Sequence, residues 1–163
     1  VHKTDLMVYL LGSPIVQASA VIGTLQKKYP DGTPITVDDN AFCTFVMRNG
    51  VTGTMHASWT NYGREDNATS LYGTTGAMHI YKDPAHAIVI ERGGTERTCF
   101  DTDAIQTNDS QTKSGIIDLF IDCILRDTAP VISAEDVLPA MRAIFACAKS
   151  AEQGGGLVDI GSL

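Results

Sequence analysis

Several common signatures of catalysis and metal binding are missing from this sequence. No C-x-x-C pair and no H-E-x-x-H motif occurs, so neither a zinc site nor a redox dithiol is predicted. No serine lies in a G-x-S-x-G context, which leaves a hydrolase triad without support. The four cysteines are widely spaced, as is typical of buried, reduced thiols in a cytosolic protein.

Positive charge and long apolar runs are also scarce. The chain has 12 Lys and Arg against 19 Asp and Glu, which gives a formal net charge of -7. Nucleic acids and anionic membranes bind basic surfaces, so we expect neither as a partner. No apolar run is long enough to span a membrane and no signal peptide opens the chain, which favours a cytoplasmic location.

The sequence also lacks a visible loop for the phosphates of a cofactor. Its glycine-rich spots are Gly73-Thr74-Thr75-Gly76, between two expected strands, and Gly154-Gly155-Gly156, after an expected helix. A dinucleotide fingerprint needs G-x-G-x-x-G between a strand and a helix, so both spots are interpreted as turns. We therefore expect no cofactor-binding residue and no metal in this chain.

What the sequence does contain is a hairpin over residues 38–62. Two runs rich in β-branched and aromatic residues flank Asn49-Gly50, which favours a two-residue type I′ turn. That turn predicts four cross-strand pairs: Phe45 with Thr54, Cys43 with His56, Val46 with Gly53, and Phe42 with Ala57. Neither face of the pair is polar throughout, so we expect both faces to be covered.

The remaining patterns predict helices before and after a run of strands. A helix over residues 1–11 ends at Gly12, and strands are expected over residues 15–26, 68–72, 77–81, 87–91, 98–100 and 157–160. Residues 101–113 are polar and predict a loop. A helix over residues 115–125 is apolar nearly all round, which is typical of a buried helix.

A last helix over residues 133–152 is expected to bury the stripe Val137, Met141, Ile144 and Ala148. Ser133 and Asp136 resemble a capping box. Pro139 leaves open a later start, with Asp136 as the cap. With 163 residues and ordinary composition, the sequence predicts a single α+β domain over residues 1–163, with helices on one face of an antiparallel sheet.

Two groups of residues are candidates for a site. His2 opens the first helix, where an imidazole can exchange a proton near neutral pH, although the pattern alone favours a non-catalytic role. Trp59, Asn61 and Tyr62 end the hairpin, where an aromatic side chain could line a ligand pocket or pack the rim of the sheet.

An ordered set of motifs resembles a known family along essentially the whole chain. The motifs are Val1-His2-x-x-Asp5-Leu6-Met7-x-Tyr9-Leu10-Leu11-Gly12, Asp39-Asn40-Ala41, Asn49-Gly50-x-x-Gly53, Ser58-Trp59, Tyr72-Gly73-Thr74-Thr75-Gly76, Phe120-Ile121-Asp122, Ser133-x-x-Asp136 and Ser150-Ala151-Glu152. They resemble the C-terminal domain of the glucose–fructose oxidoreductase / inositol dehydrogenase / rhizopine catabolism family. The chain also begins at Val1 within a helical pattern, which predicts that it is the C-terminal part of a longer protein.

The resemblance implies a fold and an activity. The fold is an open, mostly antiparallel sheet with helices on one face, like the C-terminal domain of glyceraldehyde-3-phosphate dehydrogenase. The activity is hydride transfer between NAD or NADP and a carbinol or carbonyl of a sugar, inositol or related polyol. The nucleotide is expected on an N-terminal Rossmann domain missing from this chain, so the fragment alone should be inactive. The open sheet face is expected to form a homo-oligomer, a dimer or a tetramer.

The resemblance also assigns roles to individual residues. His2 matches a catalytic histidine that moves the hydroxyl proton, and Asp5 matches an acidic residue that supports its position. Asn61 and Tyr62 match a substrate-contacting loop, and Trp59 lies beside them. The alternative is a non-catalytic assembly or binding module that keeps this fold without dehydrogenase activity.

Overall fold

The computed structural model describes residues 1–101 and 115–163. These residues form two compact units, one of Val1–Tyr62 with Leu119–Leu163 and one of Gly63–Asp118. Each unit contains one four-stranded antiparallel sheet, which confirms the predicted α+β class with open antiparallel sheets and helices. That the 163 residues form a single domain stays a prediction.

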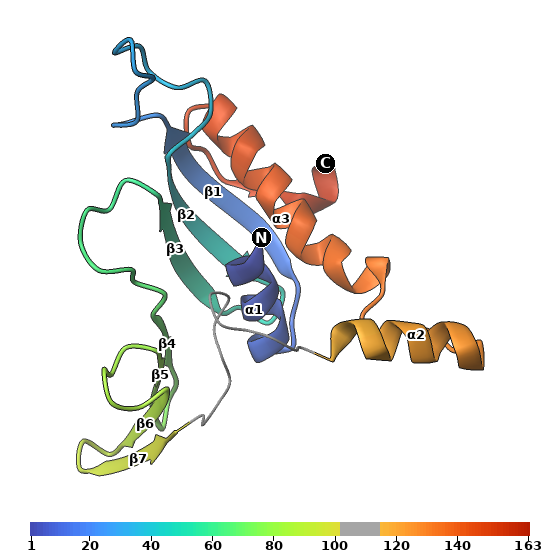
Figure 1. The fold of residues 1–163 in the computed structure, drawn as a ribbon. Helices are drawn as coiled ribbons and strands as arrows, with labels where there is room; N and C mark the ends of the chain where they lie inside the picture. Colours follow the sequence, from blue (N-terminus) through green and yellow to red (C-terminus); the bar gives the residue numbers. More distant parts are fainter. Residues whose placement is uncertain (102–114) are drawn as a thin grey trace. The chain divides into compact units, whose positions relative to one another are not determined.

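The sheet of the first unit has the strand order β3-β2-β1-β8. Its strands are β1 (Ile15–Gly23), β2 (Asn40–Met47), β3 (Thr52–Ser58) and β8 (Val158–Asp159), and a short 3₁₀ helix, η1 (Ile160–Ser162), follows. The helices α1 (His2–Leu11) and α3 (Ala134–Glu152) lie together on one face of this sheet (Figure 1). Gly12 has φ +55°, the left-handed conformation that glycine adopts readily after a helix, as predicted.

The core of the first unit lies between this sheet face and α3. Alternate residues of β1 and β2 point toward the helices, and Ala18, Ala20, Cys43 and Phe45 are buried there. The opposing surface of α3 consists of small residues, among them Ala143, Ala146 and Cys147. Small side chains let the helix approach the sheet closely, and they account for the absence of bulky α3 residues from this core.

The predicted apolar stripe of α3 is therefore wrong. The buried residues of the helix are Ala140, Ala143, Ala146, Cys147 and Ser150. Val137, Met141 and Ile144 are only partly buried, and Ala148 is exposed. The predicted capping box is confirmed: Ser133 Oγ accepts from the Asp136 N–H, and the Asp136 carboxylate accepts from the Ser133 N–H. The helix thus begins after Ser133 and contains Pro139, rather than beginning after Asp136.

The β2–β3 hairpin exists, but the predicted turn and register are wrong by one residue. The observed pairs include Phe45 with Gly53, Cys43 with Met55 and Phe42 with His56. The Gly50 N–H donates to Met47 O, the Met47 N–H donates to Val51 O, and only Gly50 has positive φ, at +86°. This geometry is a three-residue loop with a glycine bulge, whereas a type I′ turn would need positive φ at Asn49 as well.

The opposite face of the same sheet is open within the described residues. Val21 is 67 % exposed and Phe42 is 46 % exposed, and the Phe42 ring stacks on the His56 ring with centroids 4.3 Å apart. Thr44, Thr52 and Thr54 make the rest of this face more polar than the helix side. The face is thus apolar at its centre and uncovered by this chain's described helices.

The second unit is a four-stranded meander with the order β4-β5-β6-β7. Its strands are β4 (Thr69–Tyr72), β5 (Gly76–Ile80), β6 (Ile88–Arg92) and β7 (Glu96–Phe100), each close to its predicted range. Its histidines have polar partners: His79 Nδ1 lies 2.8 Å from Ser70 Oγ, and His86 Nδ1 lies 2.7 Å from Asp101 Oδ1.

Helix α2 (Ile116–Arg126) matches the predicted range, but the prediction that it is buried is wrong for the described residues, since none of its residues is buried there. Asp122 and Arg126 form an ion pair one turn apart, and the large apolar side chains around them are about half exposed or more. Except for Asp101, the loop predicted over residues 101–113 lies outside the described residues.

Candidate functional site at the end of strands β2 and β3

His2 and Asp5 lie in the first turn of α1, and both are exposed. Thr4 between them is fully buried, and its hydroxyl donates to Val1 O at 2.7 Å. The Asp5 N–H donates to the same carbonyl at 3.0 Å. Burial of Thr4 therefore fixes the start of the helix and leaves the side chain of His2 on its outer surface.

Helix α1 runs antiparallel to β3 on the helix side of the sheet. Its last residue, Leu11, accepts a hydrogen bond from Asn49 in the hairpin turn, and Met7 Sδ lies within 4.0 Å of where a Gly53 Cβ would be. Leu11 therefore lies beside the hairpin turn, and Met7 lies beside β3 at a position farther from that turn. His2, at the start of the helix, is accordingly nearer than Leu11 to the end of β3 at Ser58.

A groove lies at this end of β3, on the same face as α1. Its walls are Asp38, Asp39, Asn40, Ser58 and Trp59, and its floor contains Ala41 and Ala57. Ala41 and Ala57 pair directly across β2 and β3, and they alternate with the residues of the open face. The surface that these residues expose in the groove is mostly apolar.

Trp59 forms one wall and is held by three contacts. Its indole Nε1–H donates to Asp38 O at 3.3 Å, and its backbone N–H donates to Asp39 O at 3.2 Å. The Lys27 ammonium lies 5.6 Å from the centroid of its ring, within the range of a cation–π contact. The side chain is still 58 % exposed, so a fixed aromatic surface remains available to a ligand.

Asp39 anchors the loop that carries Lys27. Its buried carboxylate accepts backbone N–H groups from Leu25 at 2.7 Å, Gln26 at 2.9 Å and Lys27 at 2.7 Å. Burial alone would raise the pKa of Asp39, but these hydrogen bonds and one from the Asn40 amide hold that pKa well below its usual range. Asp39 is thus a permanent anion that fixes residues 25–27 against the groove.

Asn40 extends this network along the ends of the strands. Its amide donates to Asp39 Oδ1 and to Thr60 Oγ1, each at 2.9 Å. Its carbonyl oxygen lies 3.3 Å from His56 Nε2, and Thr60 Oγ1 lies 3.0 Å from Ser58 Oγ. The polar groups at this end of the sheet therefore hold each other in place around the groove.

The structure places Trp59, Asn61 and Tyr62 after the end of β3, and His2 and Asp5 in the first turn of α1. Among the described residues, no hydrogen bond, ion pair or ring contact links Trp59 with His2 or Asp5. Asn61 and Tyr62 follow Trp59 directly and are exposed, Tyr62 by 81 %. Asp39 and Lys27 were not predicted as site residues, because residues 25–27 join them through a loop whose course the sequence does not reveal.

The described residues contain no cradle for dinucleotide phosphates. Gly73 and Gly76 belong to the antiparallel β4–β5 connection, and Gly154–156 follow the C-terminal end of α3, so neither glycine cluster precedes a helix. No group of three or more His, Cys, Asp and Glu in the described part of the chain could hold a metal ion. None of the described helices is both long enough and apolar enough to cross a membrane.

Comparison with known proteins gives a family and a fold. The family described as GFO/IDH/MocA C-terminal domain matches residues 1–79, whereas no curated protein sequence matches the chain significantly. The chain resembles an oxidoreductase from Agrobacterium radiobacter solved with NAD+, L-tartaric acid and magnesium, with 19 % identity, a TM-score of 0.74, and 99 % of this chain and 47 % of that chain covered.

Two further solved structures share this fold. One is an aldose-aldose oxidoreductase from Caulobacter crescentus complexed with glycerol, with 21 % identity, a TM-score of 0.69, and 97 % of this chain and 45 % of that chain covered. The other is a levoglucosan dehydrogenase with NADH, with 20 % identity, a TM-score of 0.75, and 98 % of this chain and 48 % of that chain covered. The chain thus spans about half the length of these solved structures.

Proposed function

We propose that this chain, whose residues 1–79 match the GFO/IDH/MocA C-terminal domain family, is the substrate-binding half of a cytoplasmic NAD(P)-dependent oxidoreductase. The substrate class is a sugar, an inositol or a related polyol. The observation that carries the proposal is a groove whose lining includes the exposed aromatic side chain of Trp59, on the sheet face that α1 occupies.

The proposed reaction divides between the two halves of the full-length protein. Oxidation of a carbinol removes a hydride from carbon and a proton from the hydroxyl oxygen, and a carbonyl forms. A nicotinamide bound by a nucleotide-binding domain would supply the acceptor for the hydride. His2 accepts the proton on its imidazole, since an exposed side chain at a helix start can reach both substrate and solvent.

Four further residues have proposed supporting roles. Trp59 packs its ring against the carbon skeleton of the substrate, and Asn61 and Tyr62 hydrogen-bond its hydroxyl groups. Asp5 lies three positions after His2 on the same helix, which places the two side chains on one surface, so its carboxylate can orient the imidazole. The exposure of all these side chains supports roles in binding, because none of them is needed to fill the core.

The full-length enzyme with His2→Ala tests this assignment. Loss of a general base typically lowers kcat by about 10²–10⁴-fold, so NAD(P)H formation from an accepted polyol should fall in that range. His86→Ala is the matched control, because His86 lies in the second unit beside Asp101 and should leave turnover unchanged. Equal rates in the His2→Ala and wild-type enzymes would refute the role of His2.

We also propose that the open face of the first sheet forms a homo-oligomer, a dimer or a tetramer. Val21 and Phe42 expose an apolar centre on this face that no described helix of this chain covers. Phe42→Asp should shift the sedimentation coefficient toward the monomer, whereas Tyr9→Asp, on the exposed side of α1, should not. A wild-type chain that sediments as a monomer at high concentration would contradict the proposal.

The same face favours a second candidate function, a non-catalytic assembly module. This candidate predicts oligomers without nicotinamide turnover. A full-length protein that reduces NAD(P)+ in a His2-dependent manner excludes it.

A further inference from the structure

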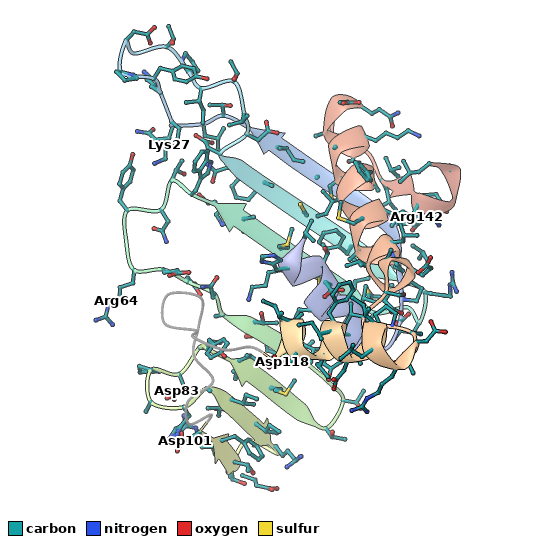
Figure 2. All side chains as sticks on the ribbon, turned by 45° about the vertical axis from the view of Figure 1, so that its right-hand side comes forward. Lys27, Arg64, Asp83, Asp101, Asp118 and Arg142 are labelled. Atoms are coloured by element: carbon teal, nitrogen blue, oxygen red, sulfur yellow. The ribbon has the colours of Figure 1, made fainter. Side chains whose placement is uncertain are left out.

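Lys27 contacts two residues that line the groove. Its backbone N–H donates to Asp39 Oδ2 at 2.7 Å. Its ammonium lies 5.6 Å from the ring centroid of Trp59. Figure 2 shows Lys27 beyond the end of the sheet toward which β3 points. The backbone and the charged end of this residue are therefore both placed against groove residues.

The ammonium of Lys27 has no ion-pair partner in the part of the chain that the structure describes. Among the described residues, no carboxylate oxygen lies within 4.0 Å of its nitrogen, although the chain is acidic with a net charge of -7. The nearby Asp39 carboxylate is already occupied by three backbone N–H groups and the Asn40 amide. The side chain is half-buried, so its charge is less hydrated than that of the exposed Lys28.

A cation held over an aromatic ring suits one kind of ligand. The exposed part of the Trp59 ring can pack against the C–H groups of a polyol, and the exposed neighbour Asp38 offers a carboxylate that can accept hydrogen bonds from hydroxyls. The ammonium can then donate charge-assisted hydrogen bonds to an anionic group at the end of that polyol. A neutral polyol has no anionic group with which this ammonium could pair.

We propose that Lys27 determines substrate specificity by binding an anionic group, so that the groove takes a polyol carrying a carboxylate or a phosphate. This inference rests on the proposed function, since it assigns the groove to the substrate of that reaction. It narrows the substrate from polyols in general to acidic ones, and it gives Asp39 a positioning role through the backbone of Lys27.

The single tryptophan of the chain gives a direct test. Trp59 is the only tryptophan among the 163 residues, so its fluorescence reports on the groove wall alone. D-glucuronate, D-glucose 6-phosphate and D-glucose are titrated into the wild-type chain, the Lys27→Met variant and the Lys28→Met variant. Lys28→Met is the matched control, because it removes the same charge one residue away from the cation–π contact.

The wild-type chain should bind an anionic sugar more tightly than D-glucose. Lys27→Met should weaken that binding about tenfold or more, because a charge-assisted hydrogen bond is lost, whereas Lys28→Met removes only screened surface charge. D-glucose should respond equally in all three proteins. The glucuronate and phosphate titrations show which acidic group the ammonium prefers.

Three results would overturn the inference: equal weakening by Lys27→Met and Lys28→Met, equal affinity for D-glucose and both anions, or no saturable response to either anion. Failure of this inference can be distinguished from failure of the proposed function. A full-length enzyme that oxidises neutral polyols in a His2-dependent manner while Lys27→Met changes no affinity overturns only this inference. Lys27-dependent binding in a full-length protein without nicotinamide turnover overturns only the proposed reaction.

Discussion

Replacing Ser150 with alanine removes the side chain that ties α3 to the sheet beneath the site. Ser150 is fully buried, and its hydroxyl accepts from the Ala20 N–H at 2.9 Å and donates to Gly156 O at 2.5 Å. Strand β8 pairs only with Gln17 and Ala18 of β1, so it ends before it can supply a partner for Ala20. The Ser150 hydroxyl thus supplies the acceptor that the short strand β8 does not provide for the Ala20 N–H.

The expected cost of Ser150→Ala follows from these two groups. A buried donor or acceptor without a partner costs about 1–3 kcal/mol. The Ala20 N–H is buried, and the Gly156 carbonyl is partly buried and can recover some hydration. We therefore expect the free energy of unfolding to fall by about 3 kcal/mol, most of it from the Ala20 N–H.

Urea unfolding followed by circular dichroism and by Trp59 fluorescence measures this loss, because Trp59 and Ser150 belong to the same compact unit. Ser133→Ala is the control: it deletes a serine hydroxyl from the capping box at the other end of α3 and should cost about 1 kcal/mol. If Ser150→Ala lost no more stability than Ser133→Ala, this role of Ser150 would be refuted.

Two other substitutions probe the supports of the site. In Asp39→Asn, at least one of the three loop N–H groups loses its acceptor, so the variant should be less stable than the wild type at pH 7. Because the folded-state pKa of Asp39 is lowered, this advantage of the wild type is fully present above about pH 4 and should shrink as the pH falls further, which urea unfolding at a series of pH values measures. Thr4→Val keeps the buried shape but deletes the hydrogen bond to Val1 O, so it should cost about 1 kcal/mol and speed amide exchange in the first turn of α1. Unchanged exchange there would contradict the view that Thr4 fixes the helix end that carries His2.

The sequence predicted those features that depend on neighbouring residues. Gly12 ended α1 and the capping box of Ser133 and Asp136 began α3, because both signals act through backbone groups within one turn. The antiparallel meander of the second unit followed from the spacing of short strands and turns. These local rules were enough to predict the α+β class.

Features that depend on tertiary packing were not predicted. The hydrophobic pattern of α3 drew attention to its large residues, whereas close packing on β1 selects the small face with Ala143 and Ala146. The anchoring role of Asp39 was not predicted, because its three donors come from residues 25–27 in a loop far from it in sequence. The roles of His2, Asp5, Trp59, Asn61 and Tyr62 stay predictions.

The hairpin turn gives the last prediction, because its two central residues have different requirements. A type I′ turn needs glycine-like freedom at both, but here only Gly50 has positive φ. Packing against the α1–β1 connection explains the choice of turn: the Arg48 N–H donates to Pro14 O and the Asn49 N–H donates to Ser13 Oγ. These contacts hold Arg48 and Asn49 at negative φ, so that the positive φ of the loop falls on Gly50.

Gly50→Ala should therefore cost about 1–2 kcal/mol, the penalty for a left-handed residue with a Cβ. Nothing lies within 4 Å of that Cβ, so the cost is conformational rather than steric contact with neighbours. Asn49→Ala loses only exposed side-chain hydrogen bonds to Val51 and Leu11 and should cost about 0.5 kcal/mol. Equal losses for the two variants in urea unfolding would instead indicate a turn with positive φ at both positions, and the one-residue shift in register would then be wrong.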